Sequence, residues 1–327
     1  MKLGKRSIVF LAVGLLAVMT MVLANPGQGV AATKFPERSI EVIVGWGAGG
    51  GTDLFARGIC APAQEILGVP LAVVNIPGAN SATAMGHILN QKADGYTVFA
   101  ITSDLLTVEA MGLLPGSLDS LEPLVRAHVD VGMIQVGKNS PFGTWDEFVK
   151  YAKDNPGKIT VAGTGAGSYD DIAVSVLMKS AGVEIKYVPF DSASEMHAAL
   201  MGGHIMAMHE ETGPSIGYIE AKEIWPILVS ADKRIEAFKD TPCAGELGLE
   251  YAPMQWRGIA VKKGTPKEVV AILEEAFTKA WETEQYKKFE KDRYLDLYPG
   301  FLRGNDFRVD MMEELGKYTS YVKDLGL

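Results

Sequence analysis

Residues 39–68 read SIEVIVGWGAGGGTDLFARGICAPAQEILG, and they join an apolar run, a glycine-rich loop and an amphipathic segment. The run IEVIV is short and rich in β-branched residues, which is typical of a buried strand. After the loop at 47–53, apolar residues recur at helical spacing from Phe55 to Ile66. Gly68 then supplies a natural helix end. The segment predicts a strand, a glycine loop and a helix, which is the repeating unit of an α/β sheet.

The same alternation of short apolar runs and amphipathic segments continues along the chain. Capping signals open several of the expected helices, for example Thr144 with Glu147 and Ser192 with Glu195. Further strands are expected at 71–75, 96–102, 131–136, 158–163, 184–190, 204–209, 225–230 and 256–261. This pattern predicts an α/β fold with mainly parallel sheets flanked by helices.

The order of these elements also predicts how the domains are arranged. Residues 231–327 hold too few elements for a domain of their own, so we expect them to complete the first α/β unit. One lobe is therefore expected from 33–127 together with 230–327, and a second lobe at 128–229 is expected to be inserted in it. Two crossover strands would join the two lobes, with a ligand cleft between them.

The composition excludes several classes of protein. The 327 residues include 31 Lys and Arg against 40 Asp and Glu, which gives a net charge of -9. A nucleic-acid protein built on a basic surface is excluded, because phosphate binding depends on clusters of Lys and Arg. Hydrophobic residues make up 47% of the chain, enough for two packed domains of ~150 residues. The two cysteines, Cys60 and Cys243, cannot build a disulfide scaffold, and we expect two free thiols.

Residues 1–32 have the layout of a secretory signal. Three basic residues precede an uncharged run from Ser7 to Ala24, and small residues end the segment. We expect a signal peptide with cleavage after Ala32, and the alternative is a retained membrane anchor. Cleavage would remove three positive charges and leave 28 basic against 40 acidic residues, a net charge of -12.

No motif for catalysis, cofactor binding or metal binding satisfies its own spacing rule. Gly132 to Lys138 fits the spacing of a nucleotide-binding loop, but Asn139 replaces the Ser or Thr that would hold magnesium. His209 begins a sequence like that of a zinc-protease helix, yet Gly213 stands where the second histidine is required. We expect no catalytic residue, no metal site and no cofactor, although a triad assembled from distant positions stays open.

Three glycine- and hydroxyl-rich loops stand between an expected strand and an expected helix, at 47–53, 77–83 and 163–168. The N–H groups at a helix start are unpaired and lie at the positive end of the helix dipole, so they can hold an anion without Lys or Arg. Ligands of open α/β sheets bind beyond the carboxyl ends of strands, where these loops lie. The loops indicate an anion-binding cleft; alternatively, they only shape and cap tight turns.

Several motifs occur together in a combination that resembles one family. They are PERSIEVIVGWGAGGGTD at 36–53, NIPGAN at 75–80, DGYT at 94–97, VPFDSASEMHAALMGG at 188–203 and WRGIAVKKGTPKEV at 256–269. The chain from about Phe35 to its C-terminus resembles the Bug family, the periplasmic solute-binding proteins of tripartite tricarboxylate transporters. The resemblance implies a monomeric, type II Venus-flytrap protein that performs no chemistry. It would close on an organic carboxylate and deliver it to a permease of one large and one small membrane subunit.

In this family the loops hold a carboxylate through backbone N–H groups, hydroxyls and bridging waters. The sequence departs from the family pattern at Gly45 and Trp46, where Pro-Phe is frequent, and at Ser192 and Ala193, where Gly-Gly is frequent. Together with the strand ends, the loops give the expected ligand-binding set: Trp46, Ala48, Gly49, Gly50, Thr52, Asp53, Gly78, Ala79, Asn80, Ser81, Thr102, Thr164, Gly165, Ala166, Gly167, Ser168, Asp191 and Glu210.

Asp191 and Glu210 are unusual members of a site for an anion. Two carboxylates near a bound anion weaken binding unless they pair with a cationic part of the ligand. We therefore expect one of them to receive an amino group or another donor of the ligand, and the alternative is a solvated or helix-capping carboxylate. Trp46 is expected either to stack on the ligand or to fill the core.

Two alternatives to a role in uptake stay open. A carboxylate-sensing partner of a membrane kinase would use the same two lobes, whereas a secreted α/β hydrolase would turn a carboxylate over. The sequence does not identify the ligand, because backbone donors recognise a carboxylate group and not the remainder of the molecule. Since the protein is acidic, its affinity for an acid is expected to come from short-range neutral donors at helix starts.

Overall fold

Six strands of the computed structural model, which describes residues 34–327, build a first sheet in the order β11-β4-β10-β3-β1-β2. β1 pairs in parallel with β2 and β3, whereas β10 pairs antiparallel with β3 and β4. The strands are β1 (Ile40–Val44), β2 (Leu71–Asn75), β3 (Thr97–Thr102), β4 (Leu121–Asp130), β10 (Gln255–Lys262) and β11 (Leu302–Arg303). The expected signal peptide at 1–32 lies outside the described residues.

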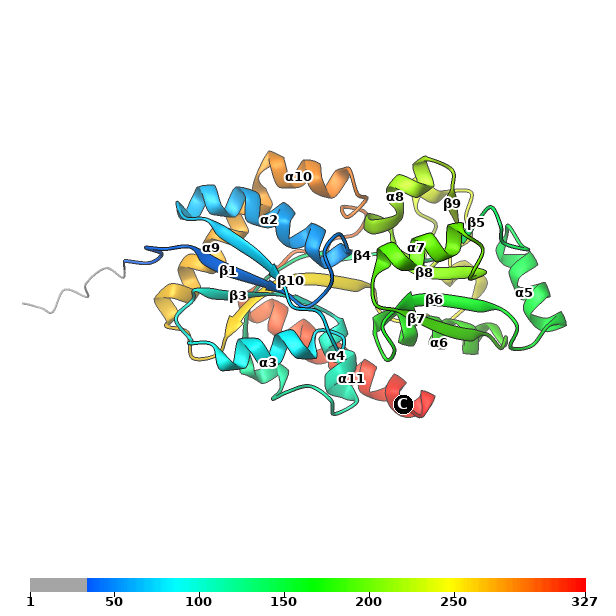
Figure 1. Ribbon diagram of the computed structural model, residues 1–327, viewed down its shortest axis with the longest axis horizontal. Coiled ribbons are helices and arrows are strands. Elements are labelled where there is room, and N and C mark those ends of the chain that lie inside the picture. The colour runs from blue at the N-terminus through cyan, green and yellow to red at the C-terminus, as the bar shows by residue number, and fades with distance from the viewer. Residues whose placement is uncertain (1–33) are drawn as a thin grey trace, which may run out of the picture. The chain divides into compact units, whose positions relative to one another are not determined.

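Helices cover both faces of this sheet, as Figure 1 shows. Alternate residues of β1 face opposite sides, so Ile40 packs with Phe55 of α2 while Ile43 packs with Phe307 of α11. The helices are α2 (Gly51–Leu67), α3 (Ala82–Asn90), α4 (Asp104–Ala110), α9 (Lys267–Glu282), α10 (Glu284–Lys291) and α11 (Gly304–Leu325). Short 3-10 helices lie at Leu118–Ser120, Glu236–Phe238 and Gly245–Leu247.

A second sheet has the order β7-β6-β8-β5-β9. Its helix α5 begins as expected, because Thr144 Oγ1 accepts from the N–H of Glu147 at 3.3 Å. The strands are β5 (Gly132–Gly137), β6 (Thr160–Thr164), β7 (Lys186–Phe190), β8 (Ala207–Glu211) and β9 (Ile224–Val229). The helices are α5 (Trp145–Asp154), α6 (Tyr169–Ala181), α7 (Ala193–Met201) and α8 (Thr212–Glu220).

The prediction of an α/β fold with two sheets flanked by helices is confirmed, but the sheets are mixed rather than mainly parallel. In the second sheet, β6 pairs in parallel with β7 and β8, while β5 pairs antiparallel with β8 and β9. The antiparallel pairs arise where the chain passes between sheets: β4 ends at Asp130 and β5 begins at Gly132. The expected lobe boundaries stay a prediction.

Neither cysteine is paired, and both are buried. Cys60 packs around the first sheet and Cys243 in a separate cluster beside β9, which confirms the prediction of two free thiols. Within residues 34–327, we find no helix that combines the length and the apolar character needed to cross a membrane.

Helix α6 follows a strand of the second sheet but packs into the core of the first. Tyr169 and Ile172 are buried in the same cluster as Phe307 of α11. The N–H of Tyr169 donates to Asp104 Oδ1 at 2.9 Å, and Thr107 Oγ1 donates to the carbonyl of Gly167 at 2.9 Å. These contacts hold the loop that precedes α6 against α4.

We expect the substitution Ile172→Ala to lower the free energy of unfolding by about 2–5 kcal/mol, because it opens a cavity in this shared core. Ile66→Ala is the matched control, since Ile66 is 41% exposed on α2. It should change stability by about 0.5 kcal/mol or less. Urea unfolding of both variants tests the packing, and equal effects would contradict it.

Candidate functional site

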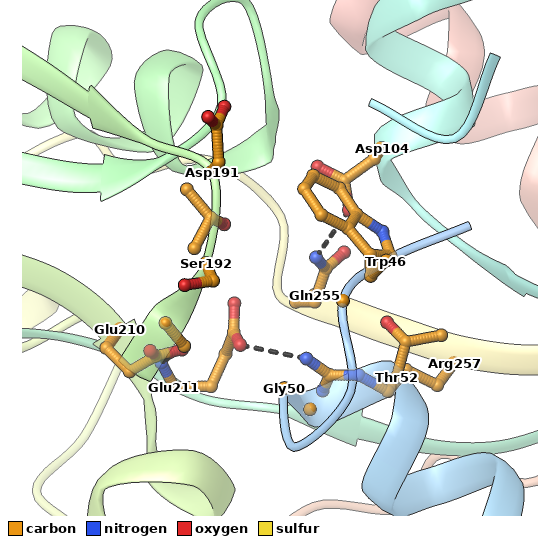
Figure 2. A pocket seen from close by; sticks show the side chains of 14 residues that line it. Trp46, Gly50, Thr52, Asp104, Asp191, Ser192, Glu210, Glu211, Gln255 and Arg257 are labelled. Carbon is orange, nitrogen blue, oxygen red and sulfur yellow. Dashed lines mark hydrogen bonds and ion pairs between the residues drawn. The ribbon is translucent and has the colours of Figure 1, made fainter. Parts of the chain in front are cut away.

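A pocket opens where loops of the two sheets meet (Figure 2). The pocket contains about 470 Å³ of space free of protein atoms, and part of this space is open to solvent. Glycines and a threonine of the loop before α2 form one wall, and the ends of β7 and β8 form another. The lining residues are Trp46, Gly47, Gly50, Gly51, Thr52, Asp104, Thr164, Asp191, Ser192, Ala193, Glu210, Glu211, Gln255 and Arg257.

The start of α2 presents free backbone donors to this pocket. Its N-cap is Gly50, which has no side chain to occupy the first N–H groups of the helix. The acidic residue of the first turn, Asp53, is turned aside, because its Oδ2 accepts from the N–H of Gly49 at 2.9 Å and its carboxylate pairs with Arg57. The N–H groups of Gly51 and Thr52 therefore remain available at the positive end of a 17-residue helix.

Arg257 of β10 supplies the cationic side chain of the lining. It is 4% exposed, and its Nη1 and Nη2 donate to Asp130 Oδ2 and Glu211 Oε2, each at 2.9 Å. Although burial lowers the pKa of a guanidinium, the carboxylates of Glu211 and Asp130 raise that of Arg257 above its ordinary value. Its Nε has no hydrogen-bond partner within residues 34–327. Gly51 is required here, since a Cβ at this position would lie 2.8 Å from Arg257 Cζ.

Three buried carboxyl groups face the same pocket. Burial raises the pKa of Glu210 to about 8 and that of Glu211 well above its ordinary value, and it also raises the pKa of Asp104. Glu210 Oε2 lies 3.1 Å from Nε2 of His197, whose own pKa is lowered to about 4 by burial. Glu210 is therefore in contact with a neutral imidazole and not with a cation.

Asp104 is held by neutral donors alone. Its Oδ1 accepts from the N–H of Tyr169 at 2.9 Å. Its Oδ2 accepts from Thr102 Oγ1 at 2.7 Å and from Gln255 Nε2 at 3.0 Å. These bonds place Asp104 and Gln255 as a fixed polar wall between the two sheets. Among residues 34–327, no group of three or more His, Cys, Asp or Glu side chains is arranged to hold a metal ion.

The structure brings part of the expected set to the pocket. Trp46 lines it and also packs on the core beneath β1, so it belongs to both surroundings that the sequence left open. The expected residues in the lining are Trp46, Gly50, Thr52, Thr164, Asp191 and Glu210. Those outside the lining are Ala48, Gly49, Asp53, Gly78, Ala79, Asn80, Ser81, Thr102, Gly165, Ala166, Gly167 and Ser168.

Several of the residues outside the lining hold the loops in shape. Ser168 caps α6, because its Oγ accepts from the N–H of Asp171 at 3.3 Å. Asn80 Nδ2 donates to the carbonyl of Ala166 at 2.7 Å, which joins the loop before α3 to the loop before α6. Asp53 fixes the glycine loop through Gly49, as described above. The hydroxyl of Ser168, the side-chain amide nitrogen of Asn80 and the carboxylate of Asp53 are thus bonded within the protein.

The sequence interpretation missed the polar residues of β10 and their partners. The lining residues that it did not name are Asp104, Gln255 and Arg257, whereas Gly47, Gly51, Ser192, Ala193 and Glu211 belong to segments that it placed at the cleft without including them in the ligand-binding set. One signal was present: Arg257 interrupts the apolar run WRGIAV at 256–261, and a charged residue within a buried strand requires a partner or a role.

Comparison with known proteins identifies a family model that covers most of the chain. Residues 55–327 match the family model described as tripartite tricarboxylate transporter family receptor. The Cupriavidus necator protein described as "UPF0065 protein in gbd 5'region" is 29% identical to this chain, over 93% of it and 92% of the relative.

Solved structures share the fold. A TctC solute-binding protein from Polaromonas is 29% identical with a TM-score of 0.66, over 89% of this chain and 99% of that one. The R. palustris protein Rpa4515, solved with adipate, is 24% identical with a TM-score of 0.82, over 89% and 98% of the two chains.

The raised pKa of Glu210 predicts a pH dependence of stability. Because the folded state keeps the proton up to about pH 8 while a free carboxyl loses it near 4.5, the free energy of unfolding should fall as the pH rises between these values. Glu210→Gln should flatten this decline, by up to about 1.4 kcal/mol per pH unit. Urea unfolding between pH 5 and about pH 9 measures the slope.

Glu195→Gln is the control for this measurement, since Glu195 is an exposed residue of the neighbouring helix α7. It should leave the slope as steep as in the natural sequence. If Glu210→Gln also leaves the slope unchanged, Glu210 does not hold a proton in the folded protein.

Removal of the Arg257 charge should be severely destabilising. Arg257→Gln leaves Asp130 and Glu211 buried without their cation, which we expect to lower the free energy of unfolding by about 3–5 kcal/mol at pH 8. The loss should shrink at pH 5, where the two carboxyls can take up protons.

Arg234→Gln is the matched control, because Arg234 pairs with Glu246 at an exposed position. Its effect should be much smaller at both pH values. Chemical denaturation at the two pH values would reject the interpretation if both variants lost the same stability.

Proposed function

Because the chain belongs to the tripartite tricarboxylate transporter family of receptors, we propose that it captures a small organic carboxylate in the periplasm and delivers it to a membrane permease. A protein of this family binds a solute and does not convert it. The proposed ligand is a di- or tricarboxylate or a related acid, and the proposed partners are the large and small integral subunits of the permease.

The observation that carries this proposal is the uncapped start of α2 in the pocket wall. Helix N-termini attract carboxylates, since their free N–H groups and the helix dipole both favour negative charge. The N–H groups of Gly51 and Thr52 can receive one carboxylate, and Arg257 Nε is a further free donor of a residue in the same wall. The adipate bound to Rpa4515 is a ligand of this chemical class.

The placement of the pocket supports capture by closure of two lobes. Its walls come from both sheets, so a ligand in it would contact the first sheet through α2 and the second through β7 and β8. Closure of this kind stabilises a bound ligand on both sides and excludes water. The chain between β4 and β5 at Val131 is one of the two connections about which we propose that the lobes turn.

Thr52 offers a direct test of the proposed carboxylate site. A thermal-shift screen of small carboxylates selects the ligand that raises the melting temperature most, since binding stabilises the folded state. Thr52→Val keeps the shape of this buried lining residue but removes its hydroxyl, and it should weaken binding of that ligand by about tenfold in calorimetry. Cellular uptake at low ligand concentration should fall by a similar factor.

Thr319→Val is the control, because Thr319 is an exposed residue of α11 whose hydroxyl donates to the carbonyl of Leu315. It should leave affinity and uptake unchanged. If no carboxylate binds, the proposed function fails. If Thr52→Val binds as well as the natural sequence, the Thr52 hydroxyl does not contact the ligand. Binding without any effect on uptake would contradict the proposed role of the permease.

A further inference from the structure

The pocket holds more negative than positive groups. Carboxyl side chains of Asp104, Asp191, Glu210 and Glu211 line it, whereas Arg257 is the cationic side chain of the lining. This excess is unexpected in a site for a carboxylate, because like charges in a desolvated pocket repel each other strongly. Either the protein takes up protons or the ligand brings a positive charge.

The single guanidinium is already shared between two carboxylates. Arg257 donates one N–H group to Asp130 and another to Glu211. The contacts of Glu210 are neutral: His197 Nε2 at 3.1 Å and the N–H of Glu211 at 3.3 Å. Glu210 is 3% exposed, so water cannot compensate its charge well. Among the described residues that contact it, no cation neutralises Glu210.

Arg257 and the carboxyl groups of Asp191 and Glu210 lie on different sides of the pocket (Figure 2), whereas Asp104 lies on the side of Arg257, where its oxygens accept hydrogen bonds from Thr102, Tyr169 and Gln255. Figure 2 shows Thr52 and Arg257 on the side of α2, and Glu210 and Asp191 on the opposite side, at the ends of β8 and β7. The side chain of Glu211 stands between them; Oε2 pairs with Arg257, and the other oxygen points into the open middle of the pocket. The pocket is therefore bipolar.

A second feature of the lining is a buried donor without a partner among the described residues. Arg257 is only 4% exposed, yet its Nε has no hydrogen-bond partner within residues 34–327. A buried donor without a partner is costly, so an acceptor supplied by a ligand would satisfy it. This donor and the N–H groups at the start of α2 can bind a carboxylate group on the α2 side of the pocket. They do not bind a second group on the side of β7 and β8.

We propose that the ligand is a zwitterion, whose carboxylate binds at the start of α2 and whose protonated amine binds at Glu210 and Glu211. The proposal rests on the proposed function and narrows its ligand class. A primary ammonium suits the acidic side because it can donate several hydrogen bonds to carboxylate oxygens.

The test compares ligands that differ only in charge at one end. Succinate and 3-aminopropanoate have the same number of methylene groups, and so do adipate and 5-aminopentanoate. In calorimetry with the purified protein at pH 8, we expect the amino acid of at least one pair to bind about tenfold tighter than its dicarboxylate. Glu210→Gln should abolish this preference by weakening binding of the amino acid, while the control Glu195→Gln should preserve it.

The pH dependence distinguishes an ammonium from a proton as the missing charge. The groups that face Glu210 are His197, Asp170, Glu211 and Arg257. If an ammonium binds, Glu210 has to ionise, so affinity for the amino compound should rise between pH 6 and about pH 8. If protonated Glu210 instead donates to an anion, affinity for the amino compound should not rise over the same range, and this result would overturn the proposal.

The remaining outcomes also decide the question. A dicarboxylate that binds as tightly as its amino partner in both pairs, or a preference that survives Glu210→Gln, overturns the zwitterion and leaves the proposed carboxylate function intact. The same holds if only carboxylates without nitrogen bind. If no carboxylate binds, with or without an amine, the proposed function fails together with this inference.

Discussion

Arg257 carries a full positive charge into a region almost closed to water, and that charge dictates what surrounds it. A guanidinium in such a place requires carboxylates in direct contact, and here they come from the end of β4 and the end of β8. The pair with Asp130 joins β10 to the point where the chain leaves the first sheet. The pair with Glu211 joins β10 to the second sheet. Gly51 lacks a side chain because the guanidinium occupies the adjacent space. The geometry of the pocket floor follows from this arrangement.

Patterns of residues close in sequence predicted the structural features that depend on contacts between such residues. The strands and helices of the α/β units, the cap of α5 at Thr144 and the loops at helix starts all follow from residues close in sequence. The mixed pairing of the sheets and the partners of Arg257 do not, because they join residues 127 and 46 positions apart. Asp104 was missed for the same reason, since its donors Tyr169 and Gln255 come from distant parts of the chain. Motif and resemblance located residues of both walls, including Thr52 and Glu210, but the polar residues Asp104, Gln255 and Arg257 between them depend on tertiary structure.

Charge in this protein acts mainly at short range. A chain with 31 basic and 40 acidic residues does not attract an anion from a distance, so an acid that enters the pocket has to be retained by what it touches. Backbone N–H groups at a helix start suit this task, because they carry partial positive charge without attracting the surrounding carboxylates as a lysine would. The buried carboxyls give the pocket a second kind of selectivity, since they penalise a ligand that is negative throughout.

The packing of α6 has a consequence for how the protein folds. The helix lies in the part of the sequence that carries the second sheet, yet Tyr169 and Ile172 complete the core of the first. Neither sheet can therefore bury its apolar surface fully without the other. Two sheets with separate cores would be free to unfold one after the other, whereas a shared core couples their loss. The chain from 35 to 327 should accordingly behave as one cooperative folding unit, in which loss of either sheet exposes the core of the other.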